Sequence, residues 1–148
     1  MSEYPHQHAG GCECGAVRFT YYCRQPLSEI TARACQCLYC LPRAATYLSD
    51  VNTSLHVQVK DSRYLYAHRF GTNTADFMHC AVCNMQVFVR SEIDGFVYAL
   101  VSAPALQEFE QLQNFVSMDY DEENLPQRLS RRSQRWIPEL CIQIDDAT

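Results

Sequence analysis

Nine cysteines in a chain of 148 residues place the strongest constraint on what this sequence can fold into. Seven of them fall in three tight groups, while Cys23 and Cys141 stand alone and are expected to pack as small hydrophobic residues. The first residues, MSEYPHQHAG, lack the basic start and apolar stretch of a secretory signal, so a cytoplasmic location is expected. Because a reducing compartment does not sustain disulfides, metal binding is the leading interpretation of the grouped cysteines.

The two outer groups are a CxC pair and a CxxC pair. They consist of Cys12 and Cys14, and of Cys80 and Cys83. Two such turns facing each other supply four thiolates, which is the tetrahedral donor set of a structural zinc ion. Residues just after such pairs often need positive φ so that backbone N–H groups point at the sulfurs, and Gly15 and Asn84 stand there. The sequence therefore predicts a zinc site that cross-links distant parts of the chain.

The middle group, Cys35, Cys37 and Cys40, offers three sulfurs within six residues. Three protein ligands leave one position of a zinc ion open, as in catalytic sites, where a bound water or substrate thiol has its pKa lowered. Two alternatives stay open. A fourth ligand, with Cys23, His79 or another histidine as candidates, would make this a second structural site, and the three cysteines could also hold no metal.

Composition and charge narrow the class of protein. Hydrophobic residues make up 47% and charged residues 20% of the chain, and its length suits one domain over residues 1–148. No apolar run approaches the roughly 18 residues that span a bilayer. A net charge of −5 repels phosphate backbones. Neither a membrane nor a nucleic acid is therefore expected as a partner.

Alternating and β-branched segments predict a mainly β fold. The expected strands are Ala16–Tyr21, Thr31–Cys35, Leu55–Lys60, Tyr64–Phe70, Asp76–His79, Gln86–Arg90 and Phe96–Val101. One helix is expected at Ala105–Asn114, which carries an incomplete apolar stripe. After Met118, acidic and then basic residues indicate a solvated surface arm held by Trp136.

At its three cysteine groups, the sequence resembles the glutathione-dependent formaldehyde-activating family, which includes proteins similar to centromere protein V. Residues 10–19, GGCECGAVRF, resemble the family's opening GxCxCGAVRF. The middle group matches its CxCxxC, and Cys80 and Cys83 match its late CxxC. The resemblance covers roughly residues 6–103, and the segment from about residue 107 onward is an extension unlike the family.

The resemblance implies an Mss4-like fold of several small, curved antiparallel sheets cross-linked by zinc. It also implies two zinc ions per chain. The outer cysteines would hold the structural ion, and Cys35, Cys37 and Cys40 would hold the reactive one. Members of the family are thought to add the glutathione thiol to formaldehyde, which gives S-hydroxymethylglutathione, and they are classed as carbon-sulfur lyases. The implied partner is a small thiol such as glutathione.

Two other functions remain open. In the first, both cysteine clusters are structural and the chain is a zinc-stabilised protein-binding module whose charged arm forms the contact surface. In the second, the chain is a methionine sulfoxide reductase on a related scaffold. That activity needs a nucleophilic cysteine outside the metal-binding groups, and Cys141 lacks a recognisable setting for it.

Overall fold

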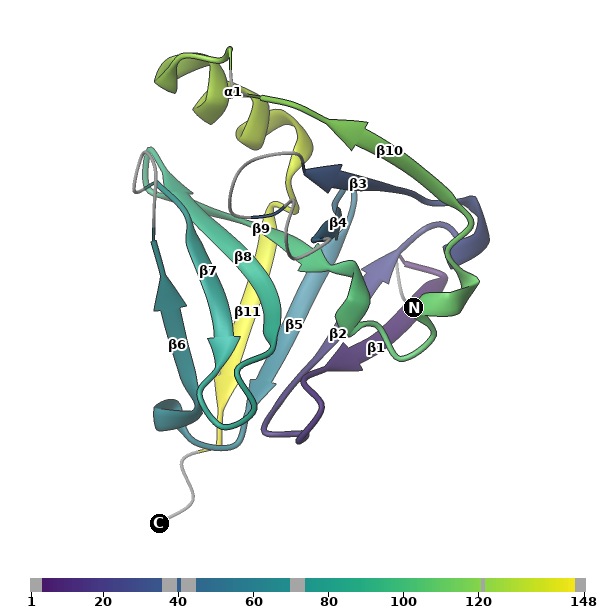
Figure 1. The fold of residues 1–148 in the computed structure, drawn as a ribbon, viewed down its shortest axis with the longest axis vertical. Coiled ribbons are helices and arrows are strands. Elements are labelled where there is room, and N and C mark those ends of the chain that lie inside the picture. The colour runs from purple at the N-terminus through teal and green to yellow at the C-terminus, as the bar shows by residue number, and fades with distance from the viewer. Residues whose placement is uncertain (1–3, 36–39, 41–44, 70–73, 121, 146–148) are drawn as a thin grey trace.

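The computed structural model describes residues 4–35, 40, 45–69, 74–120 and 122–145, and its strands form two sheets (Figure 1). The smaller sheet has the strand order β1-β2-β5-β11. Its strands are β1 (His6–Gly11), β2 (Val17–Cys23), β5 (Ser54–Val59) and β11 (Glu139–Ile144). The pairs β1–β2 and β2–β5 are antiparallel, whereas β11 runs parallel to β5.

The larger sheet has seven strands in the order β10-β3-β4-β9-β8-β7-β6. These are β3 (Thr31–Cys35), β4 (Thr46–Leu48), β6 (Leu65–His68), β7 (Asp76–Cys80), β8 (Gln86–Ile93), β9 (Phe96–Ser102) and β10 (Asn114–Met118). The edge strand β10 pairs parallel with β3, and the other pairs are antiparallel.

The main hydrophobic core lies between the two sheets. On β2, alternate side chains are buried, which is what a strand with one covered face requires. The smaller sheet contributes Val17, Phe19, Tyr21, Leu55, Val57 and Val59, and the larger one contributes Leu48, Met78, Val87, Phe88 and Val101. Cys12 and Cys80 belong to the same cluster, so the site formed by the two outer cysteine groups lies at the margin of the core.

The mainly β fold predicted from the sequence is confirmed, and each of the seven expected strands overlaps an observed one. Four strands were not expected: β1, β4, β10 and β11. The resemblance implied antiparallel sheets, whereas the sheets are mixed, because β10 and β11 each join an edge by parallel pairing.

The helix expected at Ala105–Asn114 is wrong. This region contains two short 3-10 helices, η4 (Ala103–Ala105) and η5 (Phe109–Gln111), and then enters β10. Leu106 and Leu112 are buried at the ends of these two turns, so the apolar residues reach the core one turn at a time. Two further 3-10 helices are η1 (Leu27–Glu29) and η3 (Ser62–Tyr64).

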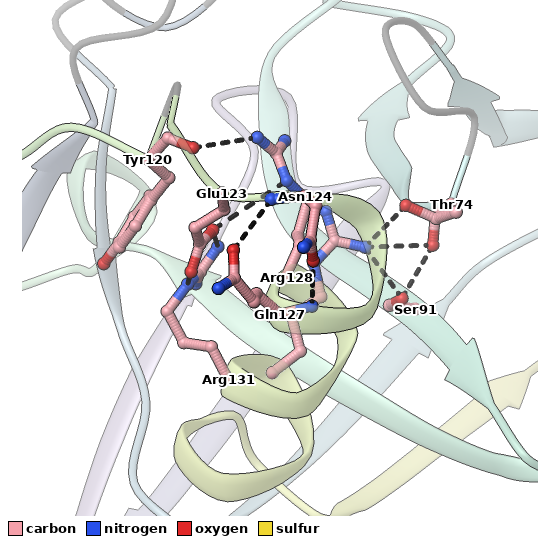
Figure 2. A network of polar contacts seen from close by, with 9 residues as sticks. Thr74, Ser91, Tyr120, Glu123, Asn124, Gln127, Arg128 and Arg131 are labelled. Atoms are coloured by element: carbon pink, nitrogen blue, oxygen red, sulfur yellow. Dashed lines mark hydrogen bonds and ion pairs between the residues drawn. The ribbon is translucent and has the colours of Figure 1, made fainter.

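The expected solvated arm is instead the α-helix α1 (Leu125–Arg135). It begins with a capping box, in which Asn124 and Gln127 exchange side-chain and backbone hydrogen bonds (Figure 2). It packs through Arg132, which is 6% exposed, rather than through an apolar stripe. Trp136, which follows the helix, is buried as expected of an anchor. Of the helices described, none has the length and apolar character needed to span a membrane.

Candidate metal centre and adjoining cavity

The tips of two hairpins bring four cysteines together. Cys12 and Cys14 lie in the turn between β1 and β2, and Cys80 and Cys83 lie at the turn between β7 and β8 (Figure 1). All four sulfur atoms lie within 4.8 Å of one another. The Cys14 Sγ is 3.5 Å from both the Cys12 Sγ and the Cys80 Sγ. Because the hairpins belong to different sheets, an ion held here would cross-link the two sheets.

The two turns have the backbone geometry that cysteine ligands need. Gly15 has φ 80° and Asn84 has φ 63°, so the prediction of positive φ at both positions is confirmed. The N–H of Val17 donates to the Cys12 sulfur at 3.3 Å, and the N–H of Val82 donates to the Cys80 sulfur at 3.4 Å. Such bonds stabilise the charge of a thiolate, which is the form that binds a metal ion.

Protonation is uneven across this cluster. Burial raises the pKa of Cys80 to about 12, although the backbone N–H groups of Cys83 and Val82 act in the opposite direction. For Cys83, burial also acts to raise the pKa, but hydrogen bonds from the backbone of Cys14 and Met85 outweigh it and bring the pKa to about 6. The cluster therefore retains protons that a bound cation would displace, as at other thiolate metal sites. The donor set and the spacing fit a tetrahedral metal ion.

The structure places two members of the middle cysteine group, Cys35 and Cys40, in one small hydrophobic cluster. Cys35 is half-buried at the end of β3, and Cys40 is 1% exposed. Ala45 links them through its backbone: its carbonyl accepts from the Cys35 N–H at 3.3 Å, and its N–H donates to the Cys40 carbonyl at 3.1 Å. Cys37 lies outside the described residues.

Tyr47 on β4 contacts Cys40 of the middle cysteine group, Cys35, Cys37 and Cys40, which is called the second cysteine group from here on. Its hydroxyl oxygen lies 3.1 Å from the Cys40 Sγ, and the Gln86 amide donates to it at 3.0 Å. The ring is 5% exposed. Burial, reinforced by the neighbouring Cys40, raises the pKa of Tyr47 far above its ordinary value, so its hydroxyl keeps its proton.

A cavity of about 390 Å³ is lined by residues that neighbour both cysteine groups. Asn84 and Met85 of its wall follow Cys83 directly. Ala45 is bonded through its backbone to Cys35 and Cys40, and Gln86 donates to Tyr47, which contacts Cys40. The complete lining is Ala45, Tyr66, His68, His79, Asn84, Met85, Gln86, Ser102 and Pro104. A cavity of this size, with several polar side chains converging on it, suits a small polar ligand.

Aromatic rings form one wall of this cavity. Tyr66 stacks on His79 with ring centroids 5.1 Å apart, and His68 meets His79 edge-on at 6.5 Å. The Tyr66 hydroxyl donates to the Asn84 side chain. Sequence reasoning did not single out Tyr66, His68 or Gln86, because Tyr66 and His68 lie on β6 and Gln86 lies on β8, at positions that form no recognisable motif. Their proximity arises from sheet pairing, which single-residue patterns do not reveal.

The candidates for a fourth ligand are placed differently. His79 lines the cavity beside the second cysteine group. Cys23 is buried on β2, donates to the Gln25 carbonyl at 3.2 Å and lines a separate cavity of about 300 Å³. Cys141 is exposed on β11, and none of the eight described cysteines forms a disulfide.

Comparison with known proteins agrees with the resemblance found in the sequence. Residues 7–118 match the model of the family described as glutathione-dependent formaldehyde-activating enzyme. The match ends at Met118, the last residue of β10, so α1 and β11 lie beyond it. A crystal structure of a protein from Rhodobacter sphaeroides is similar in fold, with a TM-score of 0.53 and 21% identity over 74% of this chain and 99% of that chain.

Proposed function

The chain belongs to the family of glutathione-dependent formaldehyde-activating enzymes, and from this premise we propose that it is a zinc-dependent enzyme of carbon-sulfur lyase type. In the reaction, the sulfur of a small thiol such as glutathione bonds to the carbon of formaldehyde or a related carbonyl compound. The thiol proton is lost from sulfur, and the carbonyl oxygen takes up a proton, so that a hydroxymethyl thioether forms without any change in redox state.

In this proposal the four outer cysteines hold a structural zinc ion. Support comes from the position of their sulfurs at the tips of two hairpins from different sheets. Without an ion, the two hairpin tips would hold four thiols side by side, and two of these, Cys12 and Cys80, belong to the main hydrophobic core. The site contributes to function by holding the hairpin of β7 and β8, which carries Gln86 and His79 to the cavity wall.

The second zinc ion would be held by Cys35, Cys37 and Cys40. When bound, a zinc ion with an open position lowers the pKa of a substrate thiol, which favours the nucleophilic thiolate at neutral pH. Ala45 carries this part of the proposal, because its backbone is bonded to both Cys35 and Cys40 and it also lines the cavity. A thiol bound in the cavity would therefore lie beside these cysteines.

The cavity's polar side chains would then orient the substrate. Ser102, which pairs with Tyr47 in the sheet, and Gln86, which is bonded to Tyr47, offer hydrogen bonds to a ligand, and His68 and Tyr66 offer them at the aromatic wall. Hydrophobic contacts come from Met85 and Pro104. This mixture suits a peptide-like thiol that has amide and carboxylate groups beside its reactive sulfur.

The proposal is tested by measuring exchange of ¹³C-labelled formaldehyde between its free and glutathione-bound forms by NMR. Glutathione and formaldehyde also combine without an enzyme, so the quantity to compare is the exchange rate above that of buffer alone. We expect the zinc-loaded protein to raise this rate and the Cys35→Ser variant to return it to the buffer rate. Cys141→Ser, which changes an exposed cysteine on β11, is the matched control and should equal the unmodified protein. A buffer rate with the unmodified, zinc-loaded protein would contradict the proposal.

A further inference from the structure

The Tyr47 hydroxyl occupies a buried position between the second cysteine group and the cavity. It comes from β4, a three-residue strand inside the larger sheet, paired with β3 on one side and β9 on the other. Within the described part of the chain, its hydrogen-bond partners are the Cys40 sulfur at 3.1 Å and the Gln86 amide at 3.0 Å. Gln86 is also part of the cavity wall.

The direction of these bonds follows from the number of protons available. The Gln86 Nε2 group only donates, so the Tyr47 oxygen accepts from it. The hydroxyl has a single proton, and the remaining partner for that proton is the Cys40 sulfur. The reverse arrangement, in which the Cys40 S–H donates, would leave a buried O–H group without an acceptor among the described residues, which is unfavourable. The sulfur of Cys40 is thus an acceptor, as a metal-binding thiolate must be.

We propose that Tyr47 is a positioning residue for the second metal site, which holds the Cys40 sulfur by an O–H···S hydrogen bond and is itself oriented by Gln86 from the cavity wall. This inference rests on the proposed function, in which Cys40 is a metal ligand. Groups that hydrogen-bond to metal ligands fix their orientation, and their loss commonly weakens metal binding. The chain of bonds begins at the surface where substrate would bind.

The experiment compares proteins loaded with ¹¹³Cd²⁺, whose NMR resonance reports the thiolates around each ion, and measures the Cd²⁺ affinity of each site by chelator competition. Tyr47→Phe removes only the hydroxyl. Gln86→Glu replaces the amide donor by an acceptor that attracts the Tyr47 proton away from Cys40. Tyr98→Phe is the matched control, because Tyr98 packs against the same small cluster and has no hydroxyl bond in the described part of the chain.

We expect two resonances from the unmodified protein. In Tyr47→Phe the resonance of the second site moves and its affinity falls about 10-fold or more, while the resonance of the outer cysteines stays in place. Gln86→Glu should move the same resonance, and Tyr98→Phe should move neither.

An unchanged second resonance and affinity in Tyr47→Phe would overturn the inference while leaving the proposed function intact. One resonance from the unmodified protein would overturn both. If Tyr47→Phe loses both resonances because it does not fold, Gln86→Glu provides the test, because it leaves Tyr47 in place. An unchanged second resonance in Gln86→Glu would then refute the proposed chain of hydrogen bonds from Gln86 through Tyr47 to Cys40.

Discussion

Replacing Arg132 by methionine tests how a polar helix is attached to this β fold. The Arg132 Nη1 donates to the Thr74 Oγ1 at 2.8 Å, to the Thr74 carbonyl at 3.3 Å and to the Ser91 Oγ at 3.1 Å. Its guanidinium also lies 5.0 Å from the centre of the Trp136 ring. These contacts join α1 to β8 and to the segment before β7, as the dashed lines to Thr74 and Ser91 in Figure 2 show.

The magnitude can be worked out from these contacts. Two N–H groups sharing three acceptors form about two good charge-assisted bonds, worth about 3–6 kcal/mol together. The cation-π contact adds about 1 kcal/mol. Against this, burial, followed by the nearby Arg131 and Arg128, lowers the pKa of Arg132 from 12.5 to about 10, which corresponds to a penalty of about 3 kcal/mol on the charge. The net contribution is therefore about 1–4 kcal/mol, and methionine retains the apolar contacts of the side chain.

Urea unfolding of the zinc-loaded protein measures this difference. We expect Arg132→Met to lower the free energy of unfolding by about 2 kcal/mol. Arg135→Met, which removes an exposed arginine from the same helix, should change it by less than about 0.5 kcal/mol. If Arg132→Met matches or exceeds the stability of the unmodified protein, the cost of burying the charge outweighs its hydrogen bonds and the reasoning is refuted.

Three further predictions concern a buried carboxylate, two glycines and the metal. Burial acts to raise the pKa of Asp76, but hydrogen bonds from Arg69 and Arg90 lower it overall, so its stabilising effect is present above its ordinary pKa of 3.8 and is lost as pH falls through the lower folded value. The stability gap between the unmodified protein and Asp76→Asn should hence shrink as pH falls below about 4 in urea unfolding, and a constant gap would disprove this. Gly11→Ala places a Cβ 2.4 Å from the Val17 carbonyl oxygen at φ 152°, whereas Gly95→Ala at φ 84° meets no atom within 4 Å. Thermal unfolding should show about 1 kcal/mol lost for Gly95→Ala and at least about 2 kcal/mol more for Gly11→Ala, and equal losses would contradict the clash. Chelation should lower the Tm reversibly, by an amount equivalent to about 3 kcal/mol relative to free zinc at a hundredfold excess over Kd, and an unchanged Tm would refute a structural role for the ion.

Much of the fold was accessible from the sequence because its signals are local. Alternation on β2 and β5 reflects one face in the core, and the positive φ at Gly15 and Asn84 follows from the needs of cysteine turns. The cysteine spacing likewise predicted which four sulfurs would meet, since two short turns constrain their ligands strongly.

The parts that were missed depend on contacts between distant segments. Helix α1 has the polar sequence LPQRLSRRSQR and no apolar stripe, because a buried arginine attaches it to the sheet. Its capping box at Asn124 and Gln127, with Pro126 between them in the first turn, is the signal that could have revealed it. Strands β10 and β11 add by parallel pairing to β3 and β5, and nothing in their own residues specifies those partners. The cavity could not be predicted for the same reason.

The central claim, that the cysteines form two separate zinc sites, is tested most directly by counting zinc per chain by elemental mass spectrometry. The protein is purified under reducing conditions without chelator, alongside Cys37→Ser and Cys83→Ser. We predict about two zinc ions in the unmodified protein and, with folding retained, about one in Cys37→Ser; Cys83→Ser should lose the other ion. One zinc ion in both the unmodified protein and Cys37→Ser would contradict the account and favour a zinc-stabilised binding module without a reactive metal.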